Sequence, residues 1–264
     1  MIQLINTLTF HSYKGGTGKT HLSANLAVLL STHFKKRVTI FDCDFRAPSL
    51  HLMFGLKFDK PKNWFLNDYL VGRCELQVAL HDVSTDFDLS TGSLFVAPAN
   101  FNGDEINKEI THELDEEYQM RALQHMLAAR EILADELDMD LLLIDTGPGF
   151  VLPSINAIIA SDKTFLVTKV DEFDMRGTRE LIAAVYDRLM EKSEILVNKV
   201  PFGAKNQEMI KWIEKELAMP VLWVIPCFCD VPREMSRNIF VHRYPTHEFS
   251  QSLLGLAKKI LQGL

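Results

Sequence analysis

The sequence of 264 residues predicts an α/β protein with a doubly wound, mostly parallel sheet flanked by helices. Short apolar runs alternate with longer helical patterns from one end of the chain to the other, which is typical of this architecture. Several runs are nearly continuous in Val, Ile, Leu and Phe, as expected for strands that are covered on both faces. No repeat and no Pro/Gly/Ser linker divides the chain, so we expect a single domain over residues 1–264.

The expected strands are apolar runs of five to seven residues, too short for helices of ordinary length. In order they are Leu4–Phe10, Arg37–Asp42, Ser93–Pro98, Leu141–Asp145, Thr164–Val170, Glu194–Val200 and Val221–Ile225. Longer stretches with apolar residues at helical spacing lie between and after them. These expected helices are Lys19–Phe34, Glu113–Leu137, Val151–Ala160, Arg176–Lys192, Lys205–Leu217 and Phe249–Leu261.

Residues 56–140 interrupt this alternation of strands and helices. They contain several turn residues and most of a strongly acidic segment, residues 101–146, which holds 13 acidic and 3 basic side chains, a local net charge of −10. Such a segment is usually a solvated helix face flanked by loops. The alternative is a docking surface for a basic partner, and the sequence leaves both interpretations open.

The overall composition excludes several classes of protein. With 28 basic and 35 acidic residues the net charge is −7, which excludes a globally basic nucleic-acid-coating protein but not a local basic patch. No apolar run approaches the ~18 residues of a membrane span, and polar residues interrupt any secretory signal at the N-terminus. Four cysteines are too few for a disulfide scaffold. We therefore expect a cytoplasmic protein with reduced thiols; attachment to a membrane or nucleoid stays open.

The strongest functional signal is the loop Lys14-Gly15-Gly16-Thr17-Gly18-Lys19-Thr20, which follows an expected strand and opens an expected helix. Glycines allow successive backbone N–H groups to turn inward and cradle phosphate oxygens. The N-terminus of the helix adds partial positive charge. In such a loop Lys19 reaches the β- and γ-phosphates of a nucleotide and the Thr20 hydroxyl binds Mg²⁺.

This loop departs from the common phosphate-loop pattern in a specific way. Tyr13 stands where the first glycine is expected, and Lys14 follows it. In this respect the chain resembles the MinD/ParA/Mrp family of P-loop ATPases, of the SIMIBI type, which carry a deviant Walker A motif. The resemblance implies that Lys14 reaches across a nucleotide-sandwich homodimer to the partner's phosphates. Family members usually have a hydroxyl residue where this chain has His21, whose ring can still donate to the α-phosphate.

Two acidic segments follow expected strands and resemble the switch regions of the same family. In Asp42-Cys43-Asp44, which continues to Arg46 and Pro48, the carboxylates at i and i+2 project to the same side. The resemblance implies that Asp44 orients or deprotonates the attacking water and that Asp42 supports the Mg²⁺ shell. The third motif is Asp145-Thr146-Gly147-Pro148-Gly149. There Asp145 is expected to hold Mg²⁺ through water, and a glycine N–H to sense the γ-phosphate.

Asn198 ends another expected strand at the position where the family places an asparagine against adenine, and the segment Pro226–Pro232 resembles the loop that closes over the base. That segment contains Cys227 and Cys229. Two thiolates supply half of a tetrahedral zinc site, which two chains would complete. The other interpretation is that both thiols pack around the base.

The last expected helix carries Phe249, Leu253, Leu256 and Ile260 at helical spacing. A membrane-surface helix and a core helix both fit this pattern, and its place at the end of the resemblance favours the core. Residues 201–264 contain 8 basic and 6 acidic side chains, which is weak support for DNA binding.

The resemblance as a whole implies a slow ATPase that binds ATP·Mg²⁺, forms a sandwich dimer and is reset by hydrolysis. A protein partner that stimulates hydrolysis is expected, as is a role in spatial positioning or partitioning. Three alternatives remain. One is a metallochaperone or cofactor-insertion ATPase that uses Cys227 and Cys229. Another is a tyrosine kinase, although Tyr244 is the last tyrosine and the chain lacks a C-terminal tyrosine cluster. The third is a nucleotide-gated binding module without turnover.

Overall fold

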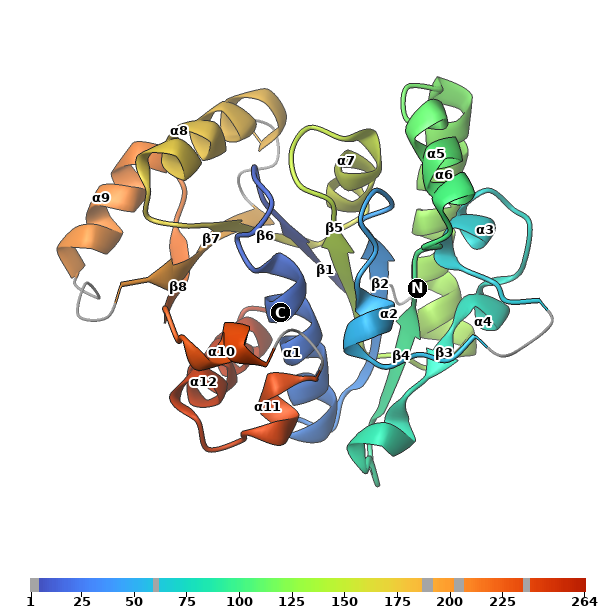
Figure 1. The fold of residues 1–264 in the computed structure, drawn as a ribbon, viewed down its shortest axis with the longest axis horizontal. Coiled ribbons are helices and arrows are strands. Elements are labelled where there is room, and N and C mark those ends of the chain that lie inside the picture. Colours follow the sequence, from blue (N-terminus) through green and yellow to red (C-terminus); the bar gives the residue numbers. More distant parts are fainter. Residues whose placement is uncertain (1–4, 59–61, 187–191, 202–206, 235–237) are drawn as a thin grey trace.

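The computed structural model describes residues 5–58, 62–186, 192–201, 207–234 and 238–264. In this part of the chain eight strands form one sheet in the order β3-β4-β2-β5-β1-β6-β7-β8 (Figure 1). All neighbouring pairs are parallel except β3 with β4. The strands are β1 Asn6–His11, β2 Arg37–Cys43, β3 His81–Asp82, β4 Ser93–Ala97, β5 Leu141–Thr146, β6 Lys163–Thr168, β7 Ser193–Val200 and β8 Val221–Pro226.

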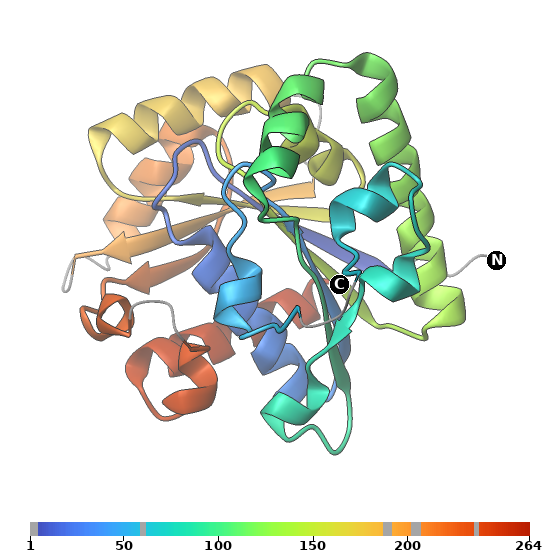
Figure 2. The same ribbon diagram turned by 45° about the vertical axis from the view of Figure 1, so that its right-hand side comes forward.

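Helices cover both faces of this sheet, as Figures 1 and 2 show from two directions. One face packs against α1 (Lys19–Thr32), α11 (Phe240–Arg243) and α12 (Glu248–Gln262), with α2 (Leu50–Met53) nearby. The opposite face is covered by α3, α4, α6, α7, α8 and α9. Their bounds are Leu66–Leu70, Leu76–Ala79, Glu116–Glu131, Leu152–Ile159, Glu172–Leu181 and Gln207–Leu217; α5 spans Gly103–His112 and α10 spans Asp230–Arg233. The predicted doubly wound architecture is confirmed.

The seven predicted strands all occur, with ends that differ by one or two residues; Leu4 lies outside the described residues. The edge strand β3 was missed because two residues carry no readable alternation. Helix α5 was also missed, although Asn102 caps it by accepting a hydrogen bond from the Asp104 backbone N–H at 2.9 Å. An Asn followed by acidic residues in the first turn is a recognised helix start. The predicted acidic helix therefore begins later, at Glu116, where Asp115 caps α6.

Two other helices differ from their predicted limits. Helix α8 begins at Glu172, four residues before the predicted start, because the Asp171 side chain caps it through the Asp174 N–H. Residues 187–191, just before its predicted end at Lys192, lie outside the described part, as does Lys205, the predicted start of the next helix. Both α6 and α8 continue into one π-helical turn, at Ile132–Glu136 and Ile182–Tyr186.

The C-terminal helix is a core helix, as the sequence favoured. Phe249, Leu253, Leu256 and Ile260 are buried, and the helix packs on α1 and β8. Its apolar stripe is thus used inside the protein and is not presented as a membrane-binding face. None of the described helices combines the length and apolar character that a membrane span requires.

Candidate nucleotide-binding site

The sheet order brings the three predicted motifs to one place. Strand β5 lies between β1 and β2, with Asp145 opposite Phe10 of β1 and Asp42 of β2. Because all three strands are parallel, the segments that leave their carboxyl ends meet at the same edge of the sheet. The glycine-rich loop leaves β1, the first acidic segment leaves β2, and the second leaves β5. Three motifs that lie far apart in the chain therefore surround a single volume.

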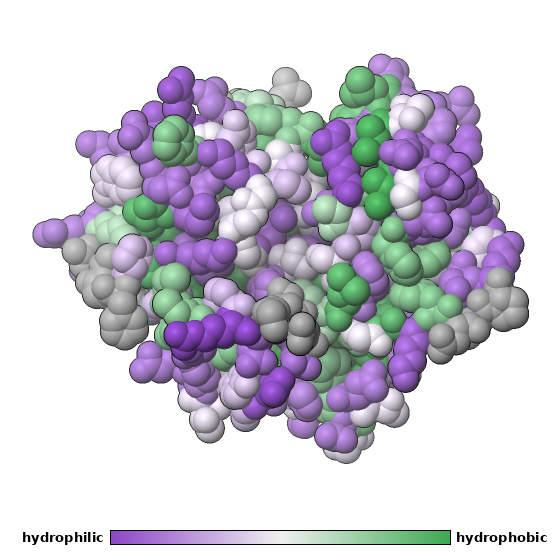
Figure 3. Space-filling model, in the orientation of Figure 1, coloured by the Kyte–Doolittle hydropathy of each residue, from purple (hydrophilic) through white to green (hydrophobic). Residues whose placement is uncertain are grey.

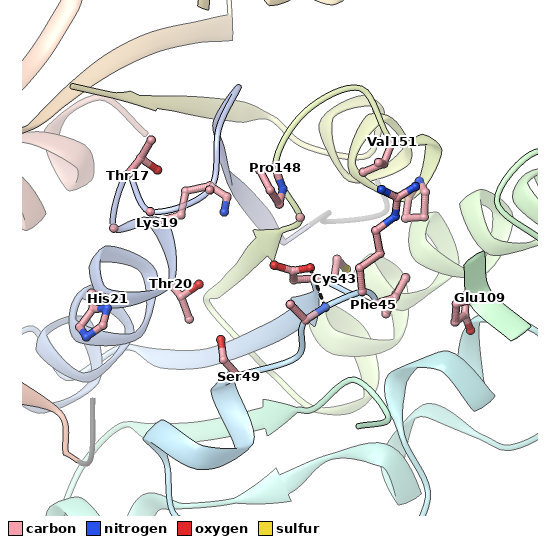
Figure 4. A pocket seen from close by; sticks show the side chains of 18 of the residues that line it. Thr17, Lys19, Thr20, His21, Cys43, Phe45, Ser49, Glu109, Pro148 and Val151 are labelled. Carbon is pink, nitrogen blue, oxygen red and sulfur yellow. Dashed lines mark hydrogen bonds between the residues drawn. The ribbon is translucent and has the colours of Figure 1, made fainter. Parts of the chain in front are cut away.

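A cavity of about 750 Å³ lies at this edge. Its walls come from the glycine-rich loop, from the segments after β2 and β5, and from α2, α5 and the start of α7 (Figure 4). The predicted residues on the wall are Gly15, Gly16, Thr17, Gly18, Lys19, Thr20, His21, Asp44 and Gly147. Figure 4 shows the Lys19 and Thr20 side chains pointing into the cavity from the start of α1.

The glycines have the backbone geometry that the motif requires. Gly16 and Gly18 have positive φ angles of 77° and 94°, a backbone conformation that residues with a Cβ atom rarely adopt. Gly18 is the N-cap of α1, so the helix begins at Lys19 with its first backbone N–H groups directed at the cavity. Loop and helix together form an anion-binding cradle. Lys19 is buried beside it, where its positive charge is weakly screened.

Asp145 has the environment expected of a carboxylate that acts through a bound cation. Only 1% of the residue is exposed, and neither carboxylate oxygen has a hydrogen-bond partner within normal geometry in the described part of the chain. Burial raises its pKa to about 6, while Lys19 and the hydroxyls of Thr20 and Ser23 act in the opposite direction. A buried carboxylate without a partner beside the Thr20 hydroxyl fits a hydrated Mg²⁺ ion held between protein and phosphate.

This pKa gives a prediction for the protein without nucleotide and metal. The pKa of Asp145 in the folded protein, about 6, lies above its value in the unfolded chain, so protonation of this carboxyl group favours the folded state. This contribution to stability is present below pH 4 and is lost as the pH rises through 6. We expect the free energy of unfolding to fall by about 2–3 kcal/mol more between pH 4 and 7 in the parent protein than in Asp145→Asn. Denaturant titrations at a series of pH values measure this difference. Parallel pH profiles for the two proteins would contradict it.

Asp42 lies next to Asp145 in the sheet, on the adjacent strand β2. It does not line the cavity, and its oxygens accept three backbone hydrogen bonds at 3.1 Å, from the N–H groups of Asp44, Ser49 and Leu50. Complete burial, with Asp145 nearby, raises its pKa to about 8. In the structure Asp42 therefore fixes the turn between β2 and α2, and support for a Mg²⁺ shell stays a prediction.

Asp44 lies on the cavity wall, as predicted. Its Oδ1 atom accepts a hydrogen bond from the Ala47 N–H at 3.1 Å. Burial raises its pKa, and Lys19 is the largest opposing influence. A carboxylate with a raised pKa accepts a proton more readily, which suits the role of orienting or deprotonating water.

The far wall of the cavity was not predicted. Helix α5 contributes Glu109 and Ile110, and Arg46 from the segment after β2 donates from Nε to Glu113 Oε2 at 3.0 Å. Figure 3 shows hydrophobic residues gathered along α5. Leu114, just after this helix, is 84% exposed. Asn102 and the acidic residues after it mark the start of the helix, but only the tertiary fold places α5 beside the cavity.

Asn198 and Pro226 are not among the residues that line the cavity. The Asn198 Nδ2 atom donates to the Thr17 carbonyl at 2.7 Å, and the Lys199 Nζ atom donates to the Gly16 carbonyl at 2.8 Å. The end of β7 thus braces the outer side of the glycine-rich loop. Contact of Asn198 or Pro226 with a base stays a prediction.

Cys227 and Cys229 are both exposed in the single chain, and packing of the two thiols around a base stays a prediction. The described residues contain no group of three or more His, Cys, Asp or Glu side chains arranged to hold a metal ion. Burial and the charge of Lys199 lower the pKa of His21, which keeps its ring neutral at pH 7. A neutral ring still offers one N–H to the cavity.

Comparison with known proteins agrees with this geometry. A family model described as the CobQ/CobB/MinD/ParA nucleotide binding domain matches residues 8–241. The chain belongs to this family. The predicted resemblance to MinD and ParA proteins is thereby confirmed, and the matched region includes the glycine-rich loop and both acidic segments.

Individual proteins are also similar to most of the chain. An uncharacterized ATP-binding protein of Methanocaldococcus jannaschii is 26% identical over 254 residues, 95% of this chain and 85% of the relative. The septum site-determining protein MinD of Synechocystis is 27% identical over 218 residues, 81% and 73% of the two chains. The structure of MinD from Pyrococcus horikoshii complexed with Mg-ADP has a TM-score of 0.72 at 21% identity, covering 98% of both chains, which shows a shared fold.

Tyr13, at the deviant position of the loop, packs against helix α8. A Cβ atom placed on Gly177 would lie 1.9 Å from the Tyr13 Cε1 atom, so only glycine allows this contact. The Tyr13 ring also lies edge-on to the Phe150 ring, with centroids 6.2 Å apart. The start of the phosphate loop is therefore fixed to α8 and to the segment after β5.

We expect Gly177→Ala to lower the free energy of unfolding by about 1–3 kcal/mol, because the new methyl group collides with a packed ring. Gly103→Ala is a matched control, since no heavy atom lies within 4 Å of a Cβ built there. Urea denaturation of the two variants measures the difference. Removing the ring with Tyr13→Ser should restore part of the loss in Gly177→Ala, and equal stability of both alanine variants would contradict the steric argument.

Proposed function

We propose that this chain is a switch-type ATPase that binds ATP with Mg²⁺, dimerises in that state and is reset by slow hydrolysis. The observation that carries the proposal is the glycine cradle with Lys19 and Thr20 on the cavity wall. Asp145 does not itself line the cavity but is buried close to both residues, and its carboxylate oxygens have no hydrogen-bond partner of normal geometry in the described part of the chain. The M. jannaschii relative is named as ATP-binding, and the P. horikoshii structure contains Mg-ADP, which supports the choice of nucleotide and ion.

Each side chain has a definite task in this proposal. The backbone N–H groups of the loop bind the phosphates, Lys19 neutralises charge on the β- and γ-phosphates, and His21 donates to the α-phosphate. Thr20 and Asp145 would hold Mg²⁺, which withdraws negative charge from the phosphate oxygens. Asp44 orients the water whose oxygen bonds to the γ-phosphorus while the bond to the bridging oxygen of ADP breaks.

Lys14 has its task in the partner's site. It is not among the residues that line its own cavity, although its neighbours from Gly15 to His21 are. Because Lys14 does not line the cavity of its own chain, we propose that it acts across the dimer interface. There it neutralises the charge that develops on the transferred phosphoryl group. The exposed hydrophobic side chains on the cavity wall, Leu52 and Ile110, are then covered by the second copy.

Within the cell we propose that the ATP-bound dimer recruits a protein partner in a spatial-positioning or partitioning process, and that this partner accelerates hydrolysis. The similarity to a septum site-determining protein supports this class of role. The γ-phosphate biases the segments after β2 and β5 between two arrangements, so the cycle works as a timer.

Solution mass by light scattering tests the proposal. The protein is measured alone, with ADP·Mg²⁺ and, as the Asp44→Ala variant, with ATP·Mg²⁺. A dimer that appears only with ATP is the expected result. A dimer in every state, or a monomer throughout, would overturn the switch; in the second case phosphate release by the parent protein distinguishes a monomeric ATPase from a binding module without turnover.

A further inference from the structure

The Lys14 side chain has a specific neighbour in the single chain. Its Nζ atom lies 5.2 Å from the centroid of the Phe173 ring, within the range of a cation–π contact. Phe173 lies in the first turn of α8 and is 76% exposed, so its position is unusual for a large hydrophobic residue. The Phe173 ring therefore lies against the Lys14 ammonium group, which in the proposed function acts in the partner's site.

Helix α8 positions both Phe173 and Lys14. Gly177, one turn after Phe173, receives the Tyr13 ring, and Tyr13 directly precedes Lys14. Residues at i and i+4 of a helix share one face, so the same face of α8 receives Tyr13 and Lys14. The start of the loop is thus fixed to α8 at Tyr13, and the Lys14 ammonium group is held against the Phe173 ring.

We infer that Phe173 is a positioning residue that holds Lys14 away from phosphates in the monomer and releases it when a second copy supplies them. The inference rests on the proposed function. The contact exists only before assembly, so it opposes dimerisation by the free energy needed to break it. Exposed cation–π contacts correspond to about 0.5–1 kcal/mol, and each dimer breaks two of them. Their loss should tighten the dimer about five- to thirtyfold.

The test measures the protein concentration at which half of the chains are dimeric with ATP·Mg²⁺, in the Asp44→Ala background to prevent turnover. Phe173→Leu keeps an apolar side chain but removes the aromatic face, and it should lower this concentration five- to thirtyfold. Phe173→Tyr keeps the aromatic face and should match the background protein. Trp212→Leu removes a different exposed aromatic residue, on α9, and should have no effect.

A double-mutant cycle shows whether the effect passes through the lysine. With Lys14→Gln present, Phe173→Leu should no longer change the dimerisation constant. An unchanged constant for Phe173→Leu in the Asp44→Ala background would overturn the inference. So would weaker dimerisation, because Phe173 would then be a contact of the dimer itself. A background protein that stays monomeric with ATP would overturn the proposed function, and the inference with it. A background protein that dimerises with ATP while Phe173→Leu has no effect would overturn the inference alone, so the two failures are distinguishable.

Discussion

Lys14→Ala should lower the rate of ATP hydrolysis about a thousandfold while leaving most of the nucleotide affinity intact. A cation that stabilises the transferring phosphoryl group is worth about 10³–10⁵ in rate. Nucleotide affinity is retained because Lys14 does not line its own cavity, whereas Lys19 does. Phosphate release and equilibrium binding of a fluorescent ATP analogue measure the two quantities. Lys211→Ala, an exposed lysine on α9, is the matched control and should hydrolyse ATP normally.

Mixing two inactive variants tests whether Lys14 acts across the dimer. In a heterodimer of Lys14→Ala and Asp44→Ala, one site has the Asp44 of its own chain and the Lys14 of the other. If the lysine acts in trans, an equal mixture regains about a quarter of the parent rate, because half of the dimers are mixed and one of their two sites is complete. A lysine that acts within its own chain leaves the mixture inactive.

Asp44→Ala should lower the hydrolysis rate by about 10²–10⁴ and leave the protein in its ATP-bound state. Asp44 is the carboxylate on the cavity wall whose pKa is raised by burial, and its removal leaves the attacking water without an acceptor. Single-turnover phosphate release measures the rate, and gel filtration of the ATP-loaded protein measures the persistence of the dimer. Asp86→Ala, at an exposed aspartate, controls for the loss of a surface charge. Rapid phosphate release by Asp44→Ala would remove Asp44 from the mechanism.

The sequence was sufficient for the sheet and for the phosphate cradle because both depend on local patterns. Buried strands such as Leu141–Thr146 are read from continuous apolar residues, and the glycine-rich loop from residue types at fixed spacing. The antiparallel strand β3 has only two residues, and the helix α5 lies in the acidic segment, where apolar periodicity is weak. The local signal for α5 is the capping residue Asn102 with acidic residues after it.

The candidate site was predicted only in part, since several of its contacts depend on elements far apart in the chain. Arg46 meets Glu113 because α5 crosses the cavity, and Asn198 meets the Thr17 carbonyl because β7 lies beside the loop. Neither pairing has a signature in the sequence. Asp42 shows the converse: its spacing from Asp44 suits a metal site, but the backbone N–H groups around it use both oxygens. Single-domain organisation and the roles of the site residues stay predictions.

The hydrogen bonds of Asp42 have a consequence for how tightly a nucleotide is held. One carboxylate binds the backbone at Asp44 and again at Ser49 and Leu50, so it closes the intervening segment into a small ring whose two ends are already fixed. Ordering a residue costs about 1–2 kcal/mol of conformational entropy. Only residues 45–48 lie between the fixed points, so the two arrangements of the proposed switch are confined to this short stretch, and ordering it when a nucleotide binds costs little.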